Sequence, residues 1–148
     1  MDTDRLLEDE DRGWLELTEL FGDIPTDRFD EPSVTPDGWS AKDAMYHIAA
    51  WCEEAATVLG RITAGTHRGG AVDVDRLNAE WLDVGRGLDD DVVRIRFAKG
   101  RTAMRQAFER LAEVDGVAWE WFEESGPRHY AEHLPDLRAF LERDPGRP

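Results

Sequence analysis

The chain has 148 residues and is strongly acidic, with 33 acidic against 18 basic residues and a formal net charge of -15 at pH 7. A field of this sign repels phosphates and anionic lipids, so we expect neither a nucleic-acid partner nor a membrane partner. Hydrophobic residues make up 41% of the sequence and include six Trp and six Phe, which excludes a disordered acidic chain. The length suits one folded domain over residues 1–148.

Cysteine content and hydropathy bear on the cellular location. The single cysteine, Cys52, cannot form an internal disulfide, which fits a reducing compartment. An uncharged run from Ala44 to Cys52 is much shorter than the roughly 20 residues that a membrane-spanning helix needs. We therefore expect a cytoplasmic protein.

Apolar residues recur at three- and four-residue spacings along most of the chain, which is the period of amphipathic helices. A first helix is expected over about residues 3–21, with the acidic run Glu8–Asp11 on its solvated face. Three prolines predict a long crossing loop over residues 22–39. The segment Ser40–Asp43 is similar to a capping box, so a second helix is expected to begin there and end near residue 65.

The remaining elements are also helical. A short helix is expected over about residues 73–84 and a long one over about residues 90–114, while the segment Trp119–Phe122 is expected to lie in a loop. The segment Ser125–Pro127 predicts the start of a last helix, because proline suits a first turn, and the tail from about residue 144 is expected to fray. Four long helices, one short helix and no strands predict an all-α fold, a four-helix bundle.

Three of the four histidines form a candidate metal site. His129 and His133 lie four residues apart on the expected last helix, a spacing that brings their Cβ atoms to about 5–6 Å on one face. His47 lies one turn before Trp51, on the buried stripe of the second helix, where it is either a metal ligand or a core histidine bonded to a nearby oxygen. Three neutral imidazoles would hold Zn²⁺, Ni²⁺ or Fe²⁺ and leave a position open for a nucleophile. His67 lies between glycines and is interpreted as a loop residue.

Carboxylates near these histidines have several interpretations. Asp43 precedes His47 by four residues and Asp136 follows His133 by three, so both are candidates to orient the ligands. Glu132 completes an H-x-x-E-H pattern, the inverted zincin motif in which the glutamate is a general base. The fifteen residues after the motif offer no obvious third ligand, so Glu132 is interpreted as a helix-surface carboxylate or a supporting group.

Several segments together resemble the DinB/YfiT-like metalloenzyme superfamily. The run Trp39–Asp43, followed by His47–Trp51, resembles its W-[ST]-x-K-D-x-x-x-H-[IL]-x-x-W signature. Asn78–Trp81 is similar to its mid-chain segment, and His129–His133 is similar to its C-terminal H-Y-x-x-H element. The similarity covers about residues 36–141, and the most similar subgroups are the ClbS/DfsB-like and maleylpyruvate isomerase N-terminal-like four-helix proteins.

This resemblance implies a four-helix bundle with a divalent metal held by His47, His129 and His133. It also implies membership among thiol-using transferases and isomerases, whose cofactors are mycothiol, bacillithiol or glutathione. The sequence has 16 Arg and 2 Lys, an excess that indicates a GC-rich genome and favours mycothiol. The ClbS-like subgroup instead implies hydrolysis of a reactive small molecule, and the family as a whole suggests a homodimer.

We therefore expect a metal-dependent transferase, isomerase or hydrolase in which the metal activates a thiol or water to attack an electrophilic small molecule, with detoxification as a candidate role. Trp51, Tyr130 and Trp39 are expected to wall its pocket. The alternative is a non-catalytic helical binding or sequestration protein whose histidines are structural. Pro135 departs from the family pattern, and it predicts a kink just after His133.

Overall fold

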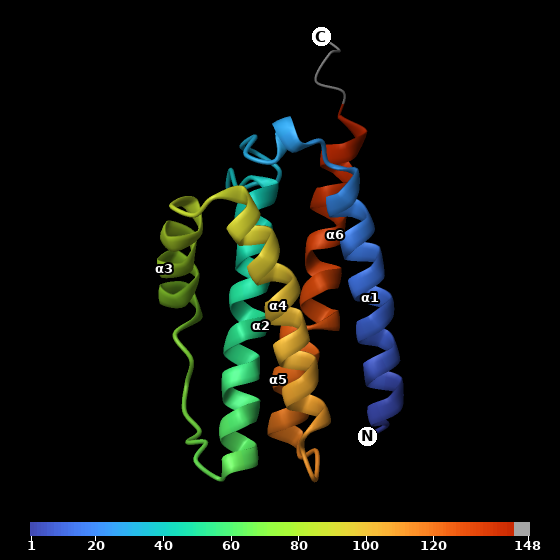
Figure 1. Ribbon diagram of the computed structural model, residues 1–148, viewed down its shortest axis with the longest axis vertical. Helices are drawn as coiled ribbons and strands as arrows, with labels where there is room; N and C mark the ends of the chain where they lie inside the picture. The colour runs from blue at the N-terminus through green and yellow to red at the C-terminus, as the bar shows by residue number, and fades with distance from the viewer. Residues whose placement is uncertain (144–148) are drawn as a thin grey trace.

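The computed structural model describes residues 1–143, so the expected frayed tail lies outside the described residues. All regular structure in this range is helical, which confirms the all-α prediction. No helix among these residues is both long and apolar enough to cross a bilayer. In chain order, the elements in Figure 1 are α1 (Thr3–Asp23), the 3-10 turn η1 (Thr26–Arg28), α2 (Ala41–Ala64), α3 (Val74–Arg86), α4 (Asp90–Glu109), α5 (Gly116–Ser125) and α6 (Pro127–Glu142).

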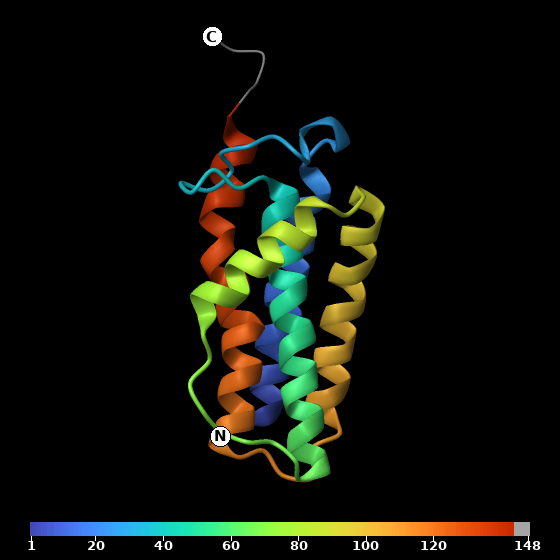
Figure 2. The same cartoon turned by 90° about the vertical axis from the view of Figure 1, so that its left-hand side faces the viewer.

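The helices α1, α2, α4 and the consecutive pair α5 and α6 pack side by side as a four-helix bundle. Figures 1 and 2 show α2 and α4 running in one direction and α1 and α6 in the other. The most extensive packing joins α2 to α4, and α1 packs mainly on α6. The short helix α3 lies outside the bundle against α2, and the loop around η1 crosses one end, as the sequence predicts.

The start of α2 is set by the expected capping box, and this fixes the helix that carries His47. The Ser40 hydroxyl accepts a hydrogen bond from the Asp43 backbone N–H at 3.0 Å, and the Asp43 carboxylate accepts one from the Ser40 N–H at 3.0 Å. At the other end, Gly65 adopts a left-handed φ of 73°, a conformation that glycine adopts without steric cost. The prediction for α2 is confirmed at both ends.

Two boundaries predicted from the sequence are wrong. The segment expected to be a loop around Trp119–Phe122 belongs to α5, whose first turn is capped by the Asp115 carboxylate accepting from the Ala118 N–H at 2.8 Å. The helix α4 ends at Glu109 rather than near residue 114. The apolar period continues past that end because Leu111 and Val114 still pack against the core from an irregular segment.

A single glycine separates α5 from α6. Gly126 has φ -103° and ψ -110°, and a Cβ built there would lie 2.8 Å from the carbonyl oxygen of Phe122 and 3.2 Å from Met104 Cε. A larger residue at position 126 would therefore clash with the Phe122 carbonyl oxygen and crowd the Met104 side chain. Pro127 begins α6, as expected, and the helix continues through Pro135, so the predicted kink does not end it.

The acidic run Glu8–Asp11 is not uniformly solvated, contrary to prediction. Glu10 is 0% exposed and pairs with two residues of α4, at 2.7 Å from Arg101 and 3.2 Å from Arg105. Asp11 is exposed and pairs with the same two arginines. Consecutive helical residues point about 100° apart, so one member of a four-residue run turns toward the core. We call Glu10, Asp11, Arg101 and Arg105 the arginine cluster.

Candidate metal centre

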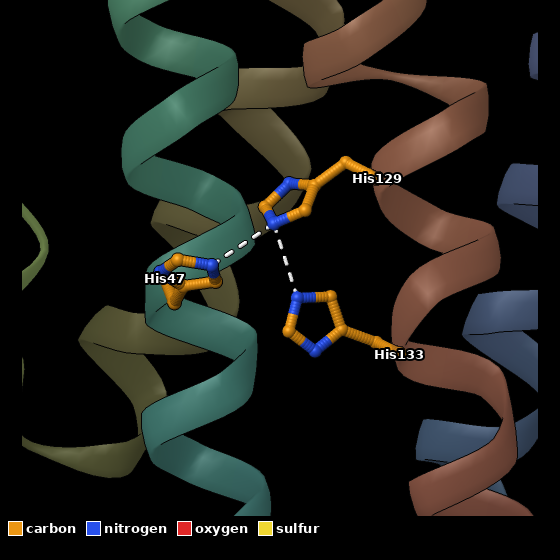
Figure 3. A group of neighbouring side chains, drawn as sticks. All are labelled: His47, His129 and His133. Carbon is orange, nitrogen blue, oxygen red and sulfur yellow. Dashed lines mark hydrogen bonds between the residues drawn. The ribbon is translucent and has the colours of Figure 1, made fainter. Parts of the chain in front are cut away.

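Three histidines converge between α2 and α6, and we call them the histidine cluster. Figure 3 shows His47 on α2 facing His129 and His133 on α6. The Nε2 atom of His129 lies 2.9 Å from Nε2 of His47 and 3.0 Å from Nε2 of His133. The helical turn that carries both α6 histidines is intact, although Pro135 follows it closely. The i, i+4 spacing and the facing position of His47 thus bring the three predicted residues together.

Hydrogen bonds among the three rings cannot pair all three Nε2 atoms. A neutral imidazole nitrogen offers either one N–H or one lone pair, so Nε2 of His129 can form one full hydrogen bond but contacts two other nitrogens. A cation bound at 2.0–2.1 Å from each nitrogen accepts one lone pair from every ring. Two such bonds span up to about 4 Å, so nitrogens about 3 Å apart fit a shared ion. The donor set and its spacing therefore fit a divalent metal.

Burial keeps the three imidazoles neutral. It lowers the pKa of His47 to about 3, with the neighbouring His133 acting in the same direction. Burial, followed by the charges of the other two rings, lowers the pKa of His129 well below its ordinary value. The pKa of His133 is also lowered by burial, while Asp136 acts in the opposite direction. Neutral rings keep their lone pairs available at pH 7, as metal ligands must.

The Nδ1 atoms of the rings have fewer hydrogen-bond partners than the sequence predicts. The buried Nδ1 atoms of His47 and His129 have no hydrogen-bond partner among residues 1–143. Asp43, a candidate to orient His47, instead completes the capping box and pairs with Arg86 at 3.3 Å. Its carboxylate is thus held at the start of α2, which explains why it does not reach the ring.

A cavity of about 400 Å³ opens beside the histidine cluster, between α2, α3, α5 and α6. His47 and His129 lie on its wall, and His129 is only 7% exposed. A cavity of this size falls within the usual range for a small-molecule site. The other lining residues are the apolar Trp51, Trp121, Val72 and Val74 and the polar Asn78, Glu120, Glu124, Ser125 and Glu132.

The three aromatic residues expected to wall the pocket lie in different places. Trp51 lines the cavity, and its indole N–H donates to Asn78 Oδ1 at 2.8 Å. The ring of Trp39 packs edge-on against His47 with centroids 5.0 Å apart, outside the cavity lining. Tyr130 is 0% exposed and faces the core, because it follows His129 directly and therefore points about 100° away on the helix.

The cavity residues of α5 were not predicted from the sequence. Trp121, Glu120 and Glu124 face the cavity only because residues 116–125 are helical. A segment interpreted as a loop has no predicted face, so none of its residues could be assigned to a site. The signal that identifies this helix is Asp115, an N-cap residue three positions before Ala118.

Two further residues lie apart from the histidine cluster. His67 lies in the segment between α2 and α3 and is not among the three convergent histidines, as predicted. Cys52 is fully buried, and burial raises the pKa of its thiol to about 12. A buried protonated thiol is a poor nucleophile and a poor metal ligand.

The helical bundle, with three histidines converging beside a cavity, agrees with the resemblance to DinB/YfiT-like proteins. The family model described as mycothiol maleylpyruvate isomerase N-terminal domain matches residues 11–140. This match covers most of the chain, so the chain belongs to that family, and the resemblance is confirmed. No curated protein and no solved structure matches the chain.

Proposed function

We propose that this protein is a metal-dependent enzyme that joins a thiol, or water, to an electrophilic small molecule. The observation that carries the proposal is the convergence of three Nε2 atoms, from His47, His129 and His133, beside a cavity of about 400 Å³. The family name adds mycothiol as the thiol to test first. Zinc, nickel and iron are the candidate metals, since each binds imidazole nitrogen.

The three histidines would hold the metal through uncharged rings. Because none of these ligands is an anion, they leave the positive charge of the ion undiminished, unlike carboxylate or thiolate ligands. A divalent ion held in this way supplies Lewis acidity, lowering the pKa of a bound thiol or water toward about 7. Three protein ligands also leave a coordination position open, as is usual in catalytic sites.

The cavity supports binding of the second reactant. His47 and His129 lie on its wall, so a molecule in the cavity sits directly beside the proposed metal position. The hydrogen bond from Trp51 to Asn78 and the edge-on contact of Trp51 with Trp81, at a centroid distance of 4.9 Å, hold this wall in one orientation. A fixed wall places the electrophile without a further loss of side-chain freedom.

The experiment is a thiol-consumption assay with metal-loaded protein, mycothiol and a panel of electrophiles. We expect thiol loss and a thioether or isomerised product, both abolished by chelation and restored by adding the metal back. His133→Ala should reduce the rate by at least about 100-fold, because losing an outer partner of a ligand already costs 10- to 100-fold. Equal rates with and without metal would contradict the proposal.

A sequestration protein is the second candidate, and the open cavity beside the histidine cluster is the observation that favours it. Such a protein would bind the electrophile with the same dependence on metal but release it unchanged. Mass spectrometry of the ligand after incubation separates the two functions, since turnover produces a molecule of different mass or retention time.

A further inference from the structure

The wall of the cavity contains a side-chain amide whose orientation is fixed by its neighbour. The indole N–H of Trp51 donates to Oδ1 of Asn78 at 2.8 Å, and both residues line the cavity. An indole nitrogen can only donate, so the atom of Asn78 that faces it is the oxygen, and a flipped amide is excluded. The amide nitrogen therefore takes the other position.

The amide nitrogen of Asn78 has two N–H groups and no acceptor in the protein. Within residues 1–143, Asn78 accepts from Trp51 and its Nδ2 atom donates to no protein atom. The Trp51 ring is held in turn by its edge-on contact with Trp81, at a centroid distance of 4.9 Å. The amide is thus fixed before any molecule binds, and its N–H groups are free to donate to a molecule in the cavity.

A second uncharged polar group on the wall also lacks a partner. Ser125 is only 5% exposed and lines the cavity, and its hydroxyl forms no hydrogen bond with any atom of the described residues. Buried polar groups without a partner in the chain are usually paired by a bound molecule or by water. A hydroxyl can donate or accept, so Ser125 suits either kind of ligand group, whereas the nitrogen of Asn78 suits only an acceptor.

The rest of the wall suits an apolar or aromatic frame. Trp51 and Trp121 line the cavity together with Val72 and Val74, which are 41% and 47% exposed. An apolar group bound against these side chains removes them from water, which favours binding. The ligand that fits this wall therefore combines an apolar frame with an accepting oxygen.

We infer that Asn78 selects an electrophile that carries a carbonyl oxygen on an apolar or aromatic frame, by donating an N–H to that oxygen. This inference rests on the proposed function, in that the cavity beside the histidine cluster is taken as the substrate site. A carbonyl is favoured over other acceptors because a hydrogen bond to its oxygen also stabilises the negative charge that develops there when a nucleophile attacks. Asn78 is thus a specificity-determining residue, and Trp51 is the positioning residue that orients its amide.

The test uses three uncharged probes of similar shape: acetophenone, 1-phenylethanol and ethylbenzene. Their binding to the zinc-loaded protein at pH 7 is measured by ligand-observed NMR, which suits weak ligands. We expect acetophenone to bind at least about fivefold more tightly than ethylbenzene, since one hydrogen bond between uncharged groups contributes about this much.

Asn78→Asp keeps an oxygen for the Trp51 N–H but replaces the free N–H groups with a second oxygen. This variant should lose most of the preference for acetophenone and should still bind 1-phenylethanol, whose O–H can donate to the carboxylate. The Trp51 indole N–H should exchange with water as slowly as in the parent, which shows that its hydrogen bond is retained. Zinc attracts a given probe oxygen in both proteins, so the difference between them isolates the contribution of position 78.

Gln106→Glu is the matched control, because it makes the same amide-to-carboxylate change at an exposed position of α4 outside the cavity lining, and it should keep all three affinities. Equal binding of acetophenone and ethylbenzene by the parent, binding of none of the probes, or a preference that survives undiminished in Asn78→Asp would overturn the inference. Zinc content measured in the same samples keeps the two failures apart. A protein that holds no zinc contradicts the proposed function, whereas a wrong order of affinities in zinc-loaded protein contradicts only this inference.

Discussion

The two clusters of buried polar side chains in the bundle differ in how their atoms are paired. In the arginine cluster, the fully buried carboxylate of Glu10 accepts from Arg101, Arg105 and, at 3.4 Å, the Tyr130 hydroxyl. In the histidine cluster, ring nitrogens face one another, and two buried Nδ1 atoms have no partner among the described residues. Neighbouring residues of α6 reach both clusters: Tyr130 donates to Glu10 of the arginine cluster, and His129 belongs to the histidine cluster.

This difference in pairing indicates a structural role for one cluster and a binding role for the other. Buried polar groups in folded proteins are almost always paired, because an unpaired one costs about 1–3 kcal/mol. The arginine cluster completes its own pairing and joins α1 to α4, so it serves the fold. In the histidine cluster, three Nε2 atoms converge that hydrogen bonds among themselves cannot all pair, so the cluster needs something from outside the chain, and we assign that role to a metal.

The largest effect on stability is expected from Glu10→Ala. Removing the buried carboxylate leaves Arg101 and Arg105 with only the exposed Asp11, and it leaves the Tyr130 hydroxyl without its acceptor. We expect the free energy of unfolding to fall by about 3 kcal/mol, as measured by urea denaturation. Metal binding by the folded fraction should be unchanged.

Asp11→Ala is the matched control, since Asp11 pairs with the same arginines but is exposed to solvent. Its loss should cost less than about 1 kcal/mol. If the two variants lost equal stability, burial of the pair would not be what matters, and the structural role assigned to the arginine cluster would be wrong.

The second largest effect is a pH dependence of the stability that arises from the histidine cluster. Burial lowers the pKa of His47 from 6.5 in the unfolded chain to about 3 in the folded protein. Between these values the unfolded chain binds a proton that the folded protein does not, so the stability of metal-stripped protein should fall as the pH falls below 6.5. Each such histidine contributes up to about 1.4 kcal/mol per pH unit.

Urea denaturation at several pH values below 6.5 measures this slope. His47→Ala should make it shallower, whereas His67→Ala, a substitution outside the cluster, should leave it unchanged. An identical slope in the His47 variant and the parent would show that this ring does not resist protonation in the folded state.

The smallest effect is expected from Cys52→Ala. The thiol lies 3.9 Å from the Tyr130 hydroxyl and 3.8 Å from the Ser125 carbonyl oxygen, and its pKa is raised to about 12 by burial. We expect a loss of about 1 kcal/mol in stability and no change in metal content or thiol transfer. A thiol reagent should modify Cys52 only upon unfolding. Rapid modification of the native protein, or loss of activity in the variant, would instead assign the thiol a chemical role.

The sequence predicts the histidine cluster better than it predicts the arginine cluster. The i, i+4 spacing of His129 and His133 and the position of His47 on a buried stripe are local patterns, and the structure brings these residues together. The partners of Glu10 lie about ninety residues away in the chain, so nothing near Glu10 indicates that it is buried.

The cavity was predicted only in part, for a related reason. Trp51 lies on the most regular helix of the chain, and its face could be predicted from the apolar period. The helix α5 has only ten residues and is bounded by Gly116 and Gly126, so its period is too short to detect, and its cavity residues were missed. The single-domain organisation, the cytoplasmic location and the homodimer stay predictions.

Elemental mass spectrometry shows directly whether the histidine cluster holds a metal. The protein is purified without an affinity tag and without added metal, alongside His47→Ala and the control His67→Ala. We expect about one equivalent of zinc, nickel or iron in the parent and the control, and none in His47→Ala. A parent protein that contains no metal and binds none on titration would show that the histidine cluster is not a metal site.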